Sequence, residues 1–353
     1  MLTVQAPQLP RSLYGRAIDV LPGLMLAGVI AGLAQLGAPY LGKWVPIPPI
    51  VIALVIGIAL NPLAGHPAIK PGMAFCMRVV LRWAVALLGL RVALGDIAAL
   101  GLFTCVLVIA AMTVTVVSGF AFARWSGRPD GFGALIGVGT AVCGASATLA
   151  CATVVPDYRR KQADVAFVVV AVNALATLAM LFYPPLCIAL GFDEHTAGIM
   201  LGGTIHDVAQ VVGAGYALSD VAGNTAVIVK LFRVFLLFPT VLAVGWYFTR
   251  QGAKHGEARV PVPVFALVFL LLCALNSALS YAPALAPLYA PAKVIALAGS
   301  TWGLLLAIAA LGLATSLKTL VELGWQQIAG AFATTAVIFV IVTAGLFALR
   351  AGL

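Results

Sequence analysis

The segment "GGTIHDVAQVV", residues 202–212, brings three polar side chains close together within an otherwise apolar stretch. His206, Asp207 and Gln210 would be costly inside a bilayer, where an ionisable residue usually marks a functional site. Residues three and four apart lie on the same face of a helix, so these side chains can converge on one side. The rest of the sequence indicates whether the segment lies in a membrane.

The composition is that of an integral membrane protein. Hydrophobic residues make up 63% of the 353 residues, charged residues make up 9%, and the mean hydropathy is +1.12. Apolar runs long enough to cross about 30 Å of hydrocarbon as helices recur along the whole length. Because only short loops separate them, we predict a single all-α polytopic membrane domain over residues 1–353, with about eleven membrane segments. The predicted segments are 17–37, 46–63, 75–92, 97–123, 131–153, 163–190, 196–217, 224–249, 261–281, 292–317 and 327–350.

The cysteines and the net charge argue against several other classes of protein. All six cysteines lie in apolar runs without a CxxC pair, so neither a disulfide framework nor a metal site is indicated. The net charge of +9 comes without a basic block on a soluble fold. We interpret it as basic loops that set membrane topology, and we expect no nucleic-acid partner. The first apolar run is longer than that of a signal peptide and is interpreted as the first helix.

Basic residues in the loops favour a re-entrant path for two segments. Eleven simple crossings from a cytoplasmic N-terminus put about eleven basic residues inside and seven outside, with the cluster at 159–161 on the wrong side. If segments 131–153 and 196–217 each enter and leave on one face, the split becomes about fourteen to four. Broken or re-entrant backbone is tolerated at membrane depth only where it is buried in protein or lines a cavity. We therefore predict two discontinuous or re-entrant helices here.

Internal similarity indicates a repeated unit. "GTAVCGAS" at 139–146 can be laid over "GTIHDVAQ" at 203–210. "LGLRVALGDIAALG" at 88–101 can be laid over "LGLATSLKTLVELG" at 311–324, in segments of opposite predicted orientation. Inverted repeats of this kind are common in secondary transporters.

Segment 137–147 and a pair of cations supply the predicted substrate site. If the helix breaks within "GVGTAVCGASA", free N–H groups would point at the membrane midplane and could bind an anion, whereas small-residue helix packing is the structural alternative. Lys230 and Arg233 lie one turn apart in an apolar run and favour an anionic substrate or the carboxylate of Asp207, unless they reach the interface. The predicted substrate-binding residues are Gly139, Thr140, Cys143, Gly144, Ser146, Gln210, Lys230 and Arg233.

A second group of residues is predicted to couple transport to an ion. Asp207 is the only acidic residue well inside an apolar run, and it adjoins the only such histidine, His206. A carboxylate in this setting can carry a proton or bind a cation. A hydrogen-bonded pair that ties two helices together is the structural alternative. Thr204 and Asn173 complete the predicted ion-coupling group.

The order of these motifs resembles that of the YeiH-type sulfate exporter family. The resemblance rests on "GTAVCGASA", "GGTIHDVAQVVGAG" and "AVIVKLFRVFLLFP", with "LLGLR" at 87–91 and "PGMAF" at 71–75, and it runs through most of the chain. It implies a multi-pass secondary transporter of the bacterial inner membrane, akin in fold to cation/proton antiporters and bile-acid symporters. The sequence departs from the family pattern at Ala141, where a serine is common, and at Asp207, where a glutamate is common.

We predict a secondary active transporter of a small anion (sulfate, a sulfonate or a carboxylate) coupled to H⁺ or Na⁺. Its partners would be this anion, the coupling ion, the lipid bilayer and a second copy in a homodimer. We expect no enzymatic activity and no cofactor other than a bound Na⁺. The alternatives are a monovalent cation/proton antiporter that uses Asp207 alone, a channel, and an intramembrane serine protease built on Ser146 and His206.

Overall fold

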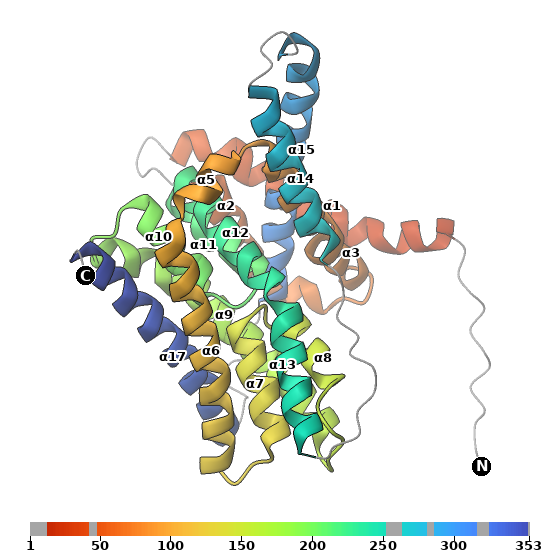
Figure 1. Cartoon of the computed structure of the whole chain (residues 1–353). Coiled ribbons are helices and arrows are strands. Elements are labelled where there is room, and N and C mark those ends of the chain that lie inside the picture. The colour runs from red at the N-terminus through yellow and green to blue at the C-terminus, as the bar shows by residue number, and fades with distance from the viewer. Residues whose placement is uncertain (1–12, 42–47, 252–262, 281–285, 316–324, 352–353) are drawn as a thin grey trace, which may run out of the picture. The chain divides into compact units, whose positions relative to one another are not determined.

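The computed structural model describes residues 13–41, 48–251, 263–280, 286–315 and 325–351, and the described chain contains helices and no strand (Figure 1). In chain order the elements are α1 (Leu13–Leu41), α2 (Pro49–Ala59), η1 (Asn61–Gly65), α3 (Lys70–Phe75), the π-helical η2 (Cys76–Val80), α4 (Leu81–Leu87), η3 (Leu88–Leu90), α5 (Leu94–Ala99), α6 (Gly101–Trp125), α7 (Asp130–Ala141), α8 (Ala145–Ala152), α9 (Lys161–Ala189), α10 (Glu194–Thr204), α11 (Val208–Leu218), α12 (Asp220–Phe235), α13 (Leu237–Arg250), α14 (Val264–Ser280), α15 (Ala286–Ala314) and α17 (Trp325–Arg350).

The helices confirm an all-α polytopic membrane protein. Seven stretches of the described chain are long and apolar enough to span a bilayer, namely Ile18–Leu41, Lys70–Leu90, Gly101–Trp125, Lys161–Ala189, Asp220–Arg250, Tyr289–Ala314 and Ala329–Arg350. Three shorter apolar helices are Pro49–Ala59, Val208–Leu218 and Val264–Leu279. The described part of each predicted segment lies in one helix or in a run of consecutive helices, whereas residues 46–47, 261–262, 281 and 316–317 of the predicted segments lie outside the described chain.

The described chain divides into two compact units. The first comprises described residues of Met1–Ala84 and Thr301–Ser316. Its helices approach closely at glycines, because a Cβ on Gly23 would lie 2.2 Å from the carbonyl oxygen of Ile69, and one on Gly57 would lie 2.7 Å from that of Ala309. Such small-residue contacts are typical of helix packing in membranes, where close van der Waals contact drives association.

The second unit, from Val85–Ser300 and Leu317–Leu353, holds all the predicted site residues. In it α6 packs against α7 and α17, while α10 and α11 pack against α12 (Figure 1). Glycines again allow the contact: a Cβ on Gly119 of α6 would lie 2.5 Å from the carbonyl oxygen of Gly133 on α7. A Cβ on Gly202 of α10 would lie 2.4 Å from that of Ala226 on α12. Small-residue packing therefore accounts for part of the glycine content.

The two segments predicted to be unusual are both broken. Segment 131–153 divides into α7 and α8, and segment 196–217 into α10 and α11, each with three residues between the halves. With 12 and 11 residues, α7 and α10 rise about 18 and 16 Å, roughly half the hydrocarbon thickness. Both breaks therefore fall at a depth where irregular backbone must be enclosed by protein.

Contacts at the ends of these pairs favour the re-entrant path. A Cβ on Gly131, at the start of α7, would lie 2.7 Å from the ring of Tyr158, which follows α8. Arg128 and Asp164, on either side of the pair, form an ion pair at 2.6 Å. Similarly, Cβ atoms on Gly198 of α10 and Gly215 of α11 would lie 2.8 and 3.3 Å from the carbonyl oxygen of Ala222. Each pair thus enters and leaves at one end of the unit.

A further contact separates the two predicted topologies. The guanidinium of Arg350 donates a hydrogen bond of 3.2 Å to the carbonyl of Gly191. Eleven simple crossings would put these residues on opposite sides of the membrane, whereas two re-entrant pairs put both outside. The predicted side of each loop is also consistent with the ion pair between Arg91 and Asp220, because both topologies place these two residues outside. The inverted repeat remains a prediction, because residues 316–324 of its second copy lie outside the described chain.

We expect a cysteine introduced at Arg159 to react with a membrane-impermeant maleimide only from the cytoplasmic side, because a re-entrant α7–α8 pair returns the chain there. A cysteine at Glu194, which the same topology places outside, is the matched control and should react only from the periplasm. Labelling of both positions from intact cells and from inverted vesicles is the measurement. Reaction of the Arg159 variant from outside would contradict the re-entrant path.

A crossing of two broken helices as candidate functional site

The breaks of the two helix pairs, residues 142–144 and 205–207, lie against each other in the second unit, and we call this region the crossing. The first is made by Gly144, whose φ of 65° and ψ of −125° form a conformation open essentially only to glycine. A Cβ on Gly144 would lie 3.8 Å from the carbonyl oxygen of His206 in the second break. Gly139 is equally constrained, because its Cβ would lie 2.4 Å from the Thr148 hydroxyl. These two predicted site residues therefore shape the backbone of the crossing.

Lys230 of α12 lies at the centre of this crossing and is fully buried. Its ammonium donates three hydrogen bonds to backbone carbonyls, at 2.6 Å to Val142, 3.0 Å to Ile205 and 2.5 Å to His206. Each oxygen requires an N–H, and an ammonium has three, so the geometry is that of the charged form with every proton used. One side chain thus joins both breaks.

Arg233, one turn further along α12, is also fully buried and bonds the last carbonyls of both half-helices. Its Nε and one terminal nitrogen donate to Ala141 at 3.1 and 2.8 Å, and that terminal nitrogen also donates to Thr140 at 3.1 Å. The other terminal nitrogen donates to Gly202 and Ile205, both at 2.9 Å. All five N–H groups of the guanidinium are therefore used.

The carbonyls bound by the two cations reproduce the internal alignment. Laying residues 139–146 over 203–210 pairs Val142 with His206, and both accept from Lys230. The same alignment pairs Ala141 with Ile205, and both accept from Arg233. The weak sequence match thus has a structural counterpart in which two similar breaks share one set of donors.

These contacts give the cations a role different from direct anion binding. The last carbonyls of α7 and α10 are the negative ends of helix dipoles and would otherwise have no donor at this depth. Lys230 and Arg233 supply those donors and have no N–H left for a ligand in this conformation. Their burial also rules out the alternative that they reach the interface. Any effect on a substrate must therefore act through charge.

His206 and Thr140 connect the crossing to α17. The Nε2 of His206 lies 2.9 Å from the hydroxyl of Thr335, and the Thr140 hydroxyl lies 3.0 Å from that of Thr334. Both predicted residues are fully buried. The Nδ1 of His206 has no partner of hydrogen-bonding geometry in the described chain, although the Thr140 backbone interacts with the ring. The histidine therefore combines a structural contact with one unused ring nitrogen.

Asp207 caps the second half of its broken helix and remains half-buried. Its Oδ1 accepts a hydrogen bond of 2.8 Å from the backbone N–H of Ala209 at the start of α11. Its charge also acts on the Lys230 ammonium and the nearby Cys143 thiol. Thr204, predicted beside it, donates its hydroxyl to the Met200 carbonyl at 2.6 Å and is buried. Asp207 is thus the accessible member of this pair.

Gln210 and Asn173 meet across α11 and α9. The side-chain amide of Gln210 donates to Asn173 Oδ1 at 3.2 Å and to the Thr177 hydroxyl at 3.3 Å. Gln210 is fully buried, and its Oε1 accepts no hydrogen bond within the described chain. Asn173 is exposed on α9. This polar group therefore extends from the enclosed crossing to an accessible surface.

The start of α8 provides the remaining predicted residues. Cys143 is 7% exposed within the first break, and Ser146, in the first turn of α8, is exposed. The N-cap residue of α8, Gly144, has no side chain to cap the helix, in contrast to Asp207 at α11, although the Cys143 thiol interacts with the Ala147 N–H. The predicted groups thus come together around the breaks, with Ser146, Asp207 and Asn173 accessible and the others enclosed.

The sequence did not single out three threonines that belong to the crossing. Thr334 and Thr335 approach Thr140 and His206 from 194 and 129 residues away, and Thr177 lies one turn after Asn173 on α9. A threonine in a membrane helix commonly bonds its own backbone, as Thr335 does with Ala331 at 2.7 Å. Their positions in the middle of apolar runs are the only available signal.

We expect Lys230→Met to lower the free energy of unfolding by about 2 kcal/mol or more, because the buried carbonyls of Val142 and His206 lose their donor at about 1–3 kcal/mol each, whereas that of Ile205 keeps its bond from Arg233. Thermal unfolding of the purified protein measures this. Lys293→Met is the matched control, since Lys293 is only partly buried and its ammonium bonds Asn276 Oδ1 at 2.7 Å. Similar melting temperatures for both variants would contradict the capping role.

Relatives of this chain are membrane proteins of bacteria. A family model described as "Conserved hypothetical protein 698" matches residues 22–331. UPF0324 membrane protein TauZ of Paracoccus denitrificans is 42% identical over 334 residues, which are 93% of this chain and 95% of the relative. UPF0324 membrane protein CT0845 of Chlorobaculum tepidum is 39% identical over 324 residues, 91% of this chain and 87% of the relative.

None of these descriptions names a sulfate exporter, so the resemblance to such a family and the wider superfamily remains a prediction. The family match extends from α1 to α17 and includes both breaks and their cations. The chain therefore belongs to the family described as conserved hypothetical protein 698, together with these UPF0324 membrane proteins.

Proposed function

We propose that this protein is a secondary active transporter of a small anion (sulfate, a sulfonate or a carboxylate), coupled to H⁺ or Na⁺ in the bacterial inner membrane. The observation that carries the proposal is the pair of breaks capped by Lys230 and Arg233. Discontinuous helices that meet near the midplane are the usual binding architecture of secondary transporters. A purely structural membrane domain has no need of broken backbone at that depth.

The balance of charge at the crossing favours an anion. The carbonyl ends of α7 and α10 together carry roughly one negative charge, and the N–H ends of α8 and α11 together carry roughly one positive charge. These contributions cancel. Lys230 and Arg233 add two positive charges and Asp207 one negative charge. A surplus of roughly one positive charge remains, and in a low-dielectric setting it favours an anionic ligand.

The accessible groups lie where such a ligand could bind. The first turn of α8, whose N-cap residue Gly144 has no side chain, presents the backbone N–H groups of Ala145 and Ser146 together with the Ser146 hydroxyl. A Cβ on Gly144 would lie 3.7 Å from Val172, the neighbour of Asn173 on α9, so these groups lie close to the accessible Asn173. We assign the anion to this end of the crossing, where Lys230 and Arg233 act through their field.

Asp207 is proposed to carry the coupling ion. It is half-buried at the N-terminus of α11, and its charge acts on Lys230. Binding of H⁺ or Na⁺ at Asp207 would increase the positive surplus, so the ion and the anion would bind cooperatively. Such reciprocal coupling between two ligands is the thermodynamic requirement of co-transport.

A ligand screen tests the substrate class. Sulfate, alkane sulfonates with and without an amino group, and small carboxylates are added to the purified protein at several pH values, with and without Na⁺. A substrate should raise the melting temperature in a concentration-dependent way, because it binds only the folded protein. If Na⁺ or another monovalent cation raises it while every anion fails, the cation/proton antiporter is the better assignment.

We expect Asp207→Asn to abolish ion-driven anion uptake into proteoliposomes, because asparagine cannot change its charge. The variant should still fold, since asparagine caps a helix about as well as aspartate. Asp193→Asn is the matched control, because Asp193 caps α10 through a 2.7 Å bond from Thr196 N–H yet lies outside the crossing. Gradient-driven uptake by Asp207→Asn at the control rate would refute the coupling role.

A further inference from the structure

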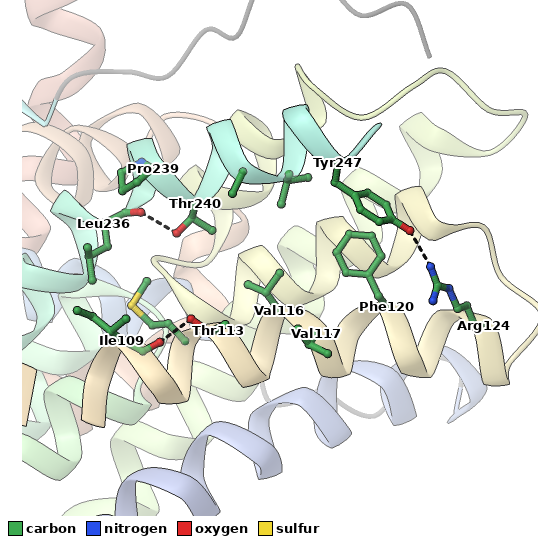
Figure 2. Close-up of a pocket in the computed structure, with 13 residues that line it drawn as sticks. Ile109, Thr113, Val116, Val117, Phe120, Arg124, Leu236, Pro239, Thr240 and Tyr247 are labelled. Carbon is green, nitrogen blue, oxygen red and sulfur yellow. Dashed lines mark hydrogen bonds between the residues drawn. The ribbon is translucent and has the colours of Figure 1, made fainter. Parts of the chain in front are cut away.

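A groove between α6 and α13 is apolar except at one end. It has a volume of about 520 Å³, within the range of about 300–1,000 Å³ typical of ligand pockets (Figure 2). Two threonines in its wall donate their hydroxyls to their own helices, Thr113 to Ile109 at 2.8 Å and Thr240 to Leu236 at 2.7 Å. The remaining apolar wall includes Met112, Val116, Phe120, Pro239, Ala243 and Val244.

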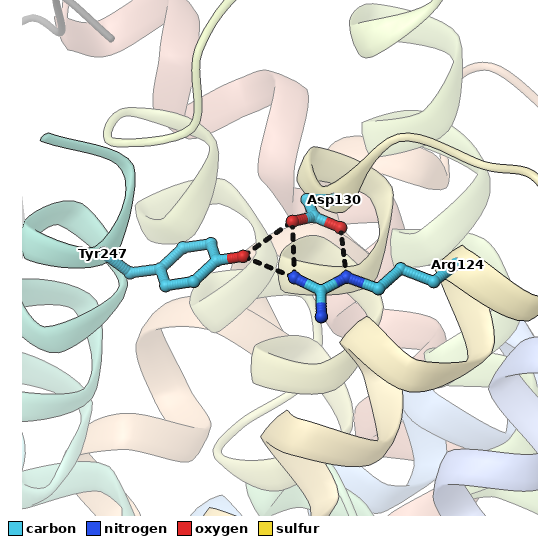
Figure 3. A network of polar contacts seen from close by, with 3 residues as sticks. All are labelled: Arg124, Asp130 and Tyr247. Atoms are coloured by element: carbon cyan, nitrogen blue, oxygen red, sulfur yellow. Dashed lines mark hydrogen bonds and ion pairs between the residues drawn. The ribbon is translucent and has the colours of Figure 1, made fainter. Parts of the chain in front are cut away.

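The polar end consists of Arg124, Tyr247 and their partner Asp130. Arg124 donates to both carboxylate oxygens of Asp130, at 3.0 and 2.9 Å, and to the Tyr247 hydroxyl at 2.6 Å (Figure 3). Tyr247 in turn donates to Asp130 at 2.7 Å. These bonds use the Nε and one terminal nitrogen of Arg124. The second terminal nitrogen makes no hydrogen bond within the described chain and points away from the cluster (Figure 3).

The groove has the length and direction of one leaflet. Ile109 and Arg124 are fifteen residues apart on α6, a rise of about 22 Å, which is close to half of the roughly 40–45 Å that a bilayer measures with its headgroup regions. Trp246 is 58% exposed beside the polar end, and the guanidinium of Arg250 lies 3.9 Å from the centre of its ring. Exposed tryptophan with arginine is typical of the membrane–water interface. The apolar end therefore points to the midplane.

We propose that the groove binds an anionic phospholipid of the cytoplasmic leaflet. One acyl chain would lie along the apolar wall, and the phosphate would accept from the unused nitrogen of Arg124. Arg124 and Arg250 against Asp130 leave one positive charge at this end, which complements an anionic headgroup. Basic sites between membrane helices on the cytoplasmic side are suited to such lipids. The loop charges place this end in the cytoplasm.

The chemistry of the groove favours a lipid over a helix from a second copy of the chain. A transmembrane helix would bring apolar or small side chains to the whole length and would leave the free nitrogen of Arg124 without an acceptor. A phospholipid presents an apolar chain to the wall and a charged oxygen acceptor at the interface. Only the lipid matches the division between the two ends.

Thermal melting of the purified full chain with phosphatidylglycerol or phosphatidylcholine of the same chain length tests the proposal. Phosphatidylglycerol should raise the melting temperature more, since only the bound lipid stabilises the folded protein. Ala243→Trp fills the groove without removing a hydrogen bond and should abolish the difference. Leu242→Trp is the matched control, because Leu242 is 45% exposed on the same helix but does not line the groove. Native mass spectrometry counts the bound lipid in each.

A second variant tests the headgroup. Arg124→Gln should reduce the preference for phosphatidylglycerol over phosphatidylcholine by about fivefold, because one arginine near an anionic membrane surface changes the affinity by about that factor. If Ala243→Trp has a lowered melting temperature in the absence of lipid, the Arg124→Gln variant is the one that tests lipid binding. Equal stabilisation of the wild type by both lipids would overturn the proposal. So would an unchanged lipid count in Ala243→Trp, or a change in its oligomeric state, which would assign the groove to a second copy.

Discussion

The rest of the second unit depends on eight N–H groups carried by two side chains of α12. A helix that ends inside a membrane leaves its last carbonyls without donors, and each unpaired buried carbonyl costs about 1–3 kcal/mol. Two helices, α7 and α10, end in this way. The turns that follow them bond only some of these carbonyls, as the N–H of Gly144 does to Gly139 at 2.9 Å and that of Ile205 to Leu201 at 3.0 Å. Lys230 and Arg233 supply donors to six further carbonyls from one turn of one helix. The cost of burying two cations and the cost of two broken helices therefore offset each other.

Because both breaks share these donors, they cannot separate without exposing buried carbonyls and charges at once. In the proposed transporter, α7, α10 and α12 would consequently move as one body, with the N–H ends of α8 and α11 as the part that adapts to a ligand. This division agrees with exposure: Lys230 and Arg233 are fully buried, whereas Ser146 and Asp207 are accessible. In this proposal the enclosed ends of α7 and α10 stay fixed to α12, and the accessible residues at the starts of α8 and α11 bind the ligands.

Periodicity and composition predicted the membrane segments and the two breaks, because hydrophobic length and glycine content are local properties of the sequence. The positions of Lys230 and Arg233 are also visible in the sequence. Their carbonyl partners are not, because a backbone carbonyl left without a donor by a distant break is not encoded in any residue type. Thr334 and Thr335 could not be predicted for a similar reason: they lie far along the chain from the residues they contact. The alignment of residues 139–146 with 203–210 is weak as sequence, yet it pairs carbonyls that share donors.

The division of one apolar stretch into α12 and α13 explains why a groove exists beside the crossing. Asp220–Arg250 is one apolar stretch, but α12 ends at Phe235 and Pro239 removes the N–H that would bond the carbonyl there. Before this point α12 must be enclosed, because it carries the two cations. After it, α13 is free to face lipid, and Phe238, Leu242 and Trp246 are 57%, 45% and 58% exposed. Its other face diverges from α6 far enough to leave the groove, and the Arg124–Asp130–Tyr247 cluster closes the gap at the interface. Since Asp130 begins α7, a lipid held at that cluster would contact the base of the broken helix whose other end Arg233 caps.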